Sequence, residues 1–264
     1  MQHPPYFYAL ILFLSAMVGG SIFLITKKQS SRGIKLLLTY SAAYLLGLSL
    51  LHLFPELFAS GIPYAGWYVI AGFMLQVILD YFSHGVEHGH AHTHDHHHGK
   101  GFLITVMASL WIHAFIEGMP FGGVFDPHAV SQAHDHAHNY AHSHGHSHDH
   151  RDSLLIGISL HKVTEALVFM ALLISTGLSK SRAFFWMIVF ALVAPLGAFA
   201  HYFIGENGFA NLATLTPKVT GILIGILLHV ATTILFESEE GHKFNRMKFG
   251  AIILGIASAA LLVG

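Results

Sequence analysis

The chain has 264 residues, of which 53% are hydrophobic and only 10% are charged, and its mean hydropathy is +0.57. A soluble domain carries about 25% charged residues because its whole surface faces water, so most of this surface is expected to face lipid. The net charge of −1 argues against a nucleic-acid partner, and the absence of cysteine excludes disulfides, thiolate metal sites and thiol nucleophiles. Histidine departs from this pattern: the chain has 24, and imidazole is the commonest metal ligand.

Eight apolar stretches are long enough to cross a bilayer as helices, which takes about 20 residues each. In chain order they are residues 6–26, 34–57, 64–83, 101–123, 153–177, 182–204, 217–237 and 247–263. The first stretch has no basic leading region and no small-residue cleavage site after it, so we expect a retained helix and not a signal peptide. The sequence therefore predicts an all-α membrane protein, a single bundle of eight transmembrane helices in the lipid bilayer.

Lysine and arginine are concentrated on one side of this predicted bundle. Ten lie in or beside the odd-numbered loops: Lys27, Lys28, Arg32, Lys35, Lys100, Lys180, Arg182, Lys243, Arg246 and Lys248. Two lie on the opposite side: Arg151 and Lys218. Because basic loops remain cytoplasmic, we expect both termini to be extracytoplasmic, in a multi-pass protein of the plasma (inner) membrane.

The second predicted helix ends in the segment His52-Leu-Phe-Pro-Glu56. Ionisable groups are costly in the hydrocarbon, so His52 and Glu56 are candidates for a role in an ion pathway. Solvation at the membrane interface is the alternative for both.

Two low-complexity segments rich in histidine flank the fourth predicted helix. Residues 84–98 contain eight histidines and residues 126–150 contain nine. Such a composition cannot bury an apolar face, so both are expected to be disordered loops, the first cytoplasmic and the second extracytoplasmic. They are interpreted as loose metal capture or buffering, with a simple solvated linker as the alternative. Neither fixes a coordination geometry, so neither is expected to be the selective site.

The fourth and fifth predicted helices each carry a histidine and a glutamate four residues apart. His113 and Glu117 share one face of the fourth helix, and His161 and Glu165 share one face of the fifth. If the two helices face each other, two imidazoles and two carboxylates converge in a set that suits zinc or another first-row divalent ion. The alternative is a structural hydrogen bond within each helix. Lys162, next to His161, either neutralises a carboxylate, fills a second cation position or lines the pathway.

Two further histidines follow, His201 near the end of the sixth predicted helix and His229 inside the seventh. For His229 a relay role again competes with simple solvation.

In these motifs the chain resembles the ZIP (Zrt-/Irt-like) family of divalent metal transporters. Residues 113–122 are similar to the family pattern His-x-x-x-Glu-Gly-x-x-x-Gly, and residues 161–166 to the His-Lys-x-x-Glu-Ala form of one branch. The segments 52–56 and 195–197 also match.

The resemblance implies a transport site of four ligands: His113, Glu117, His161 and Glu165. Other branches bind a second metal through an Asn and an acid at positions occupied here by Ala114 and Lys162. The resemblance thus implies one metal, with the Lys162 ammonium in place of a second cation. It further implies uptake into the cytoplasm by alternating access, with Zn²⁺ as the main substrate and Fe²⁺, Mn²⁺, Co²⁺ or Cd²⁺ as others, and no enzymatic activity.

Three other functions are compatible with the sequence. An exporter of the cation diffusion facilitator kind also has His-rich loops and intramembrane ligands, although it usually has six helices and a soluble C-terminal domain. An intramembrane zinc hydrolase is permitted by His and Glu ligands, but the H-E-x-x-H motif is absent. A metal sensor or buffer would bind without flux. The sequence leaves the oligomeric state open, a homodimer included.

Overall fold

The computed structural model describes residues 4–25, 31–83, 100–122, 149–208, 211–236 and 246–262. Nearly all of these residues are helical. In chain order the elements are α1 (Pro5–Ile25), α2 (Ser31–Leu48), η1 (Ser49–Leu53), α3 (Phe54–Ala59), α4 (Ala65–Ser83), α5 (Lys100–Gly118), η3 (Met119–Gly122), α7 (Asp149–Ser175), α8 (Lys180–Glu206), α9 (Leu212–Phe236) and α10 (Arg246–Leu261). The His-rich segment 84–98 lies outside the described residues, as does 126–150 up to the start of α7.

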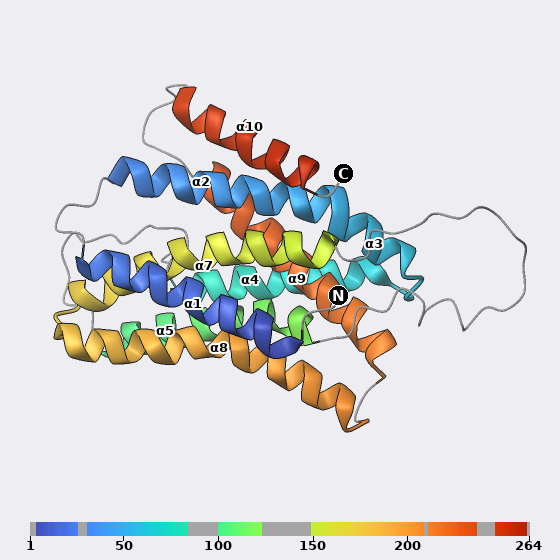
Figure 1. The fold of residues 1–264 in the computed structure, drawn as a ribbon, viewed down its shortest axis with the longest axis horizontal. Coiled ribbons are helices and arrows are strands. Elements are labelled where there is room, and N and C mark those ends of the chain that lie inside the picture. The colour runs from blue at the N-terminus through green and yellow to red at the C-terminus, as the bar shows by residue number, and fades with distance from the viewer. Residues whose placement is uncertain are drawn as a thin grey trace, which may run out of the picture.

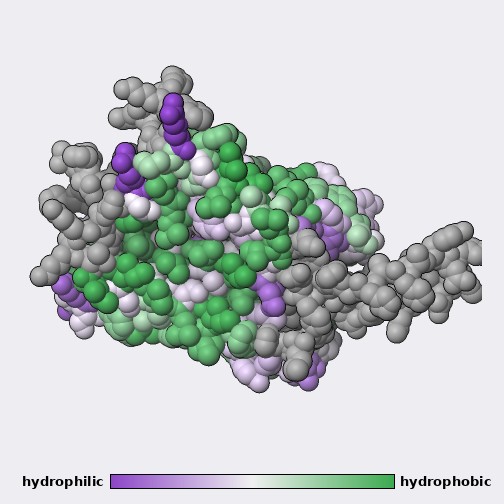
Figure 2. Space-filling model, turned by 45° about the horizontal axis from the view of Figure 1, so that its top comes forward, coloured by the Kyte–Doolittle hydropathy of each residue, from purple (hydrophilic) through white to green (hydrophobic). Residues whose placement is uncertain are grey.

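Seven spans among the described residues are long and apolar enough to cross a membrane. The eighth predicted span corresponds to α10, which has only 16 helical residues and packs along α2. On α1 the side chains of Leu10, Leu14 and Val18, spaced four residues apart, are exposed. Figure 2 shows hydrophobic residues across much of the visible surface, with hydrophilic residues mainly toward its edges. An apolar exterior of this extent characterises a multi-pass membrane protein, whereas the side that faces the cytoplasm stays a prediction from charge.

Two prolines change the helical geometry close to polar side chains. In the second span the α-helix widens into one π-helical turn, η1, where Phe54 N–H bonds to Ser49 O five residues back. Pro55 follows directly, and its missing N–H removes a regular α-helical bond, which the wider turn accommodates. Pro120 lies in the 3₁₀ turn η3 at the end of α5. Pro195, by contrast, lies inside α8, which continues through it.

The helices form two groups by their packing. In the first group α1 packs on α7 and α8, and α8 packs on α5 and η3; in the second, α4 packs on α9, and α2 on α9 and α10. Figure 1 shows these helices running mainly along the long axis, with α2 and α10 neighbouring along one side and α5 and α8 along the other. The two groups meet where α2 contacts α7 and where α4 contacts α5.

Glycines bring backbones together inside each group. A Cβ on Gly118 of α5 would collide with the backbone carbonyl of Ala194 on α8, and a Cβ on Gly72 of α4 with that of Ile222 on α9. Between the groups, Gly157 of α7 meets the side chains of Tyr44 and Leu45 on α2. Small residues allow such close packing in membranes, where the hydrophobic effect does not drive helices together and close van der Waals contact does. Each group is therefore joined backbone to backbone, and the contact at Gly157 between the groups is through side chains.

Candidate metal centre

The pair His113 and Glu117 lies on the face of α5 that is turned toward the interior. His113 Nε2 is 3.1 Å from Glu117 Oε1, and both residues are buried, with 1% and 0% of their surface exposed. The close pairing follows from the helix itself, because residues four apart stand one above the other. On its own this contact is the structural pair that the sequence left as an alternative.

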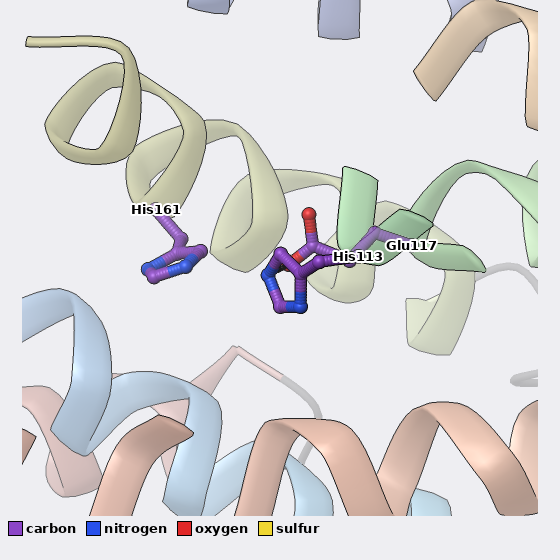
Figure 3. Close-up of side chains that lie close together, drawn as sticks. All are labelled: His113, Glu117 and His161. Atoms are coloured by element: carbon purple, nitrogen blue, oxygen red, sulfur yellow. Dashed lines mark ion pairs between the residues drawn. The ribbon is translucent and has the colours of Figure 1, made fainter. Parts of the chain in front are cut away.

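His161 adds a third ligand from a different helix, α7. One ligand atom from each of His113, Glu117 and His161 lies within 4.8 Å of the other two. Figure 3 shows the three side chains close together, with the two histidines from different helices. Their ring centroids are 6.1 Å apart and their planes are inclined by 75°. His161 Nδ1 is buried and has no hydrogen-bond partner among the described residues. A buried, unbonded imidazole nitrogen beside a second histidine and a carboxylate is suited to a metal ion.

Lys162 and Glu165, also on α7, form an ion-pair network with Glu117. Lys162 Nζ lies 2.5 Å from Glu117 Oε2 and 2.6 Å from Glu165 Oε2, and all three residues are buried. The same ammonium lies 5.3 Å from the centre of the Phe190 ring on α8. The fourth predicted ligand, Glu165, is thus not part of the three-residue cluster, and one of its oxygens is held by Lys162 instead.

The lysine changes the electrostatics expected from two carboxylates alone. With neutral imidazoles, two carboxylates and one ammonium leave a single net negative charge in a fully buried site. A buried charge is costly unless it is compensated, so the site attracts a cation. Of the roles considered for Lys162, its position between two carboxylates corresponds to neutralising one of them.

Gln76 on α4 contacts the cluster, and sequence reasoning missed it. Its Oε1 lies 3.0 Å from His113 Nδ1, and the residue is fully buried. One turn before His113 on α5, Ser109 Oγ donates to the carbonyl of Leu79 on α4 at 2.7 Å. The available signal was an amide inside a mostly apolar span, since buried polar groups in membranes need partners.

The other residues that the sequence proposed for an ion pathway or relay lie outside the three-residue cluster. His52 belongs to the π-helical turn η1 and Glu56 to α3, and both are half-buried. His229 on α9 packs edge-on against the Phe73 ring, with centroids 5.1 Å apart. His201 on α8 is buried and lies 3.1 Å, Nε2 to Oγ1, from Thr216 on α9.

The ligand set favours a borderline divalent ion. Two imidazole nitrogens and one carboxylate oxygen suit Zn²⁺, and the same donors accept other first-row metals. Three protein ligands leave a fourth position open for water, for an exogenous ligand or for Glu165 if it is released from Lys162. No protein-family model matches this chain, so its resemblance to a family rests on the motifs alone.

Proposed function

We propose that this chain is a transporter of divalent transition metal ions related to the ZIP family, with zinc as its principal substrate. The ion is taken up into the cytoplasm through a site formed by His113, Glu117 and His161. Glu165 contributes as a ligand when Lys162 moves away. This assigns no enzymatic activity to the chain.

One observation carries the proposal: three metal-ligating side chains converge, fully buried, between helices that are long and apolar enough to span a membrane. Ionisable groups at that depth are expensive and mark ion pathways in membrane proteins. A purely structural role would need only the pair on α5, whereas His161 comes from another helix and leaves Nδ1 without a hydrogen-bond partner among the described residues.

The packing of the helices supports alternating access. All three ligands belong to the first group of helices, while α4 and α9 of the second group are joined to each other through glycines. Two internally tight groups that meet through side chains are suited to moving against each other as bodies. Movement of the first group against the second would expose the ion to each side in turn.

A flux assay with one isosteric substitution tests the proposal. Purified protein is reconstituted into liposomes, and zinc entry is followed with a trapped fluorescent indicator for wild type and for Glu117→Gln. The matched control is Glu206→Gln, which changes an exposed acid at the end of α8. We expect wild-type flux, a loss of about a hundredfold or more in Glu117→Gln because an amide is a far weaker ligand than a carboxylate, and an unchanged rate in the control.

The same preparation separates the competing functions. Zinc binding without flux in the wild type favours a sensor or buffer. Zinc-dependent cleavage of lipid or peptide by the wild type favours a hydrolase, since a three-ligand zinc site with an open position also activates water. Net zinc transport out of the cytoplasm in cells favours an exporter. Full flux in Glu117→Gln, with equal folding of both proteins, contradicts the assigned site.

A further inference from the structure

The contact between Gln76 and His113 bears on which nitrogen of the imidazole ring carries the hydrogen. In the tautomer in which His113 Nδ1 carries the hydrogen, that N–H donates to Gln76 Oε1 across the 3.0 Å contact, because an amide oxygen only accepts. In the neutral ring the other nitrogen, Nε2, then holds the free lone pair. Nε2 is the nitrogen that faces Glu117 Oε1 at 3.1 Å. This tautomer presents the Nε2 lone pair beside the Glu117 carboxylate, as two ligands of one metal ion are presented, whereas the metal-free hydrogen bond to Glu117 needs a hydrogen on Nε2.

We infer that Gln76 is a positioning residue for the metal centre, holding His113 in the orientation and tautomer in which Nε2 binds the ion. The inference rests on the proposed function and deepens it, because it identifies a residue outside the two motif helices that sets the affinity of the site. Histidine ligands commonly donate their second ring N–H to such a partner, and loss of the partner typically costs about 10-fold to 100-fold in metal affinity or activity.

Where Gln76 lies in the fold distinguishes this role from simple helix packing. Gln76 belongs to α4, in the second group of helices, and it reaches across to a ligand of the first group. The same two helices are linked a turn away by Ser109 Oγ, which donates to the Leu79 carbonyl and involves no member of the cluster. Ser109 thus provides a matched control for a hydrogen bond between α4 and α5 that does not act on a ligand.

Zinc flux into liposomes, measured over a range of zinc concentrations, tests the inference. The variants are Gln76→Leu, which removes the acceptor, Gln76→Glu, which keeps an acceptor oxygen of similar reach, Ser109→Ala and His113→Ala. We expect Gln76→Leu to raise KM by about 10-fold to 100-fold with kcat much less affected, because ligand orientation sets affinity. Gln76→Glu should keep KM at or below the wild-type value, and Ser109→Ala should leave KM unchanged.

The outcomes separate this inference from the proposed function. A KM for Gln76→Leu within about twofold of wild type overturns the inference, while loss of flux in His113→Ala in the same series leaves the transport site in place. A fall in kcat alone marks a structural role and also overturns it. If Gln76→Leu does not fold, Gln76→Glu decides: a KM at or below wild type supports the inference, and a rise of about tenfold overturns it. No wild-type flux, or full flux in His113→Ala, overturns both proposals.

Discussion

Lys162 Nζ lies 2.5 Å from Glu117 Oε2, so a protein ammonium is paired with the same carboxylate whose other oxygen faces His113. Glu117 therefore connects two cationic positions, one occupied by a protein side chain and one available to a metal ion. This relationship supports the proposal that the site holds a single metal ion. Removing Lys162 should therefore lower the stability of the metal-free protein more than that of the metal-bound protein.

Replacing Lys162 with methionine should destabilise the metal-free protein. The substitution leaves Glu117 and Glu165 buried without their ammonium, and breaking a buried ion pair from one side costs about 3–5 kcal/mol. Zinc should recover much of this loss because the ion supplies positive charge. Thermal unfolding in detergent, with chelator and with zinc, measures both effects. Lys180→Met, at an exposed lysine, is the control, and equal unfolding temperatures for wild type and Lys162→Met in chelator would contradict the prediction.

His161 and His201 offer a matched pair of buried histidines with different expected roles. His161→Ala should raise the KM for zinc by at least about tenfold, because it removes a ligand of the cluster. His201 lies instead against Thr216, so His201→Ala should lower stability by about 1–3 kcal/mol and leave the KM unchanged. Flux kinetics and thermal unfolding on both variants provide the comparison. The prediction fails if the two substitutions have the same effect on KM.

The close approach of α5 to α8 should be required for the site. Gly118 directly follows Glu117, and a methyl group there would collide with the Ala194 backbone. Gly118→Ala should force the helices apart, lower stability by about 1–3 kcal/mol and reduce flux. Gly250→Ala on α10 is the control, since a Cβ there meets nothing within 4 Å. Unchanged unfolding and flux in Gly118→Ala would show that the contact has no role in the site.

The His-rich segments should account for weak zinc binding, and the central cluster should account for zinc flux. Asparagine in place of every histidine in residues 84–98 and 126–148 of the full chain should remove weak, high-capacity binding, because clustered imidazoles bind metal loosely. The flux that depends on Glu117 should persist. Equilibrium dialysis gives the number of bound ions, and the liposome assay gives the flux. Complete loss of flux would place an essential ligand in a loop.

Sequence length and hydropathy were sufficient to locate the helices. Predicted spans such as 64–83 and 182–204 overlap α4 (Ala65–Ser83) and α8 (Lys180–Glu206) closely, because an apolar stretch of this length has few alternatives in lipid. The ends are less exact: α7 begins at Asp149, four residues before the predicted start at 153, since polar residues can extend a helix beyond the hydrocarbon. Helix geometry alone also placed His113 and Glu117 together.

Which side chains meet across helices was decided only by the tertiary structure. The helices are apolar on lipid-facing and buried sides alike, so their sequences carry little periodicity to indicate which face turns inward. The rotation of each helix depends instead on close packing, such as that of Gly118 against α8. That packing places His161 beside His113 and Lys162 between Glu117 and Glu165. It also places Gln76 against Nδ1 of His113. The sequence by itself determined the spans and the pairing of His113 with Glu117 within α5, while the arrangement of one helix against another determined which ligands share the site.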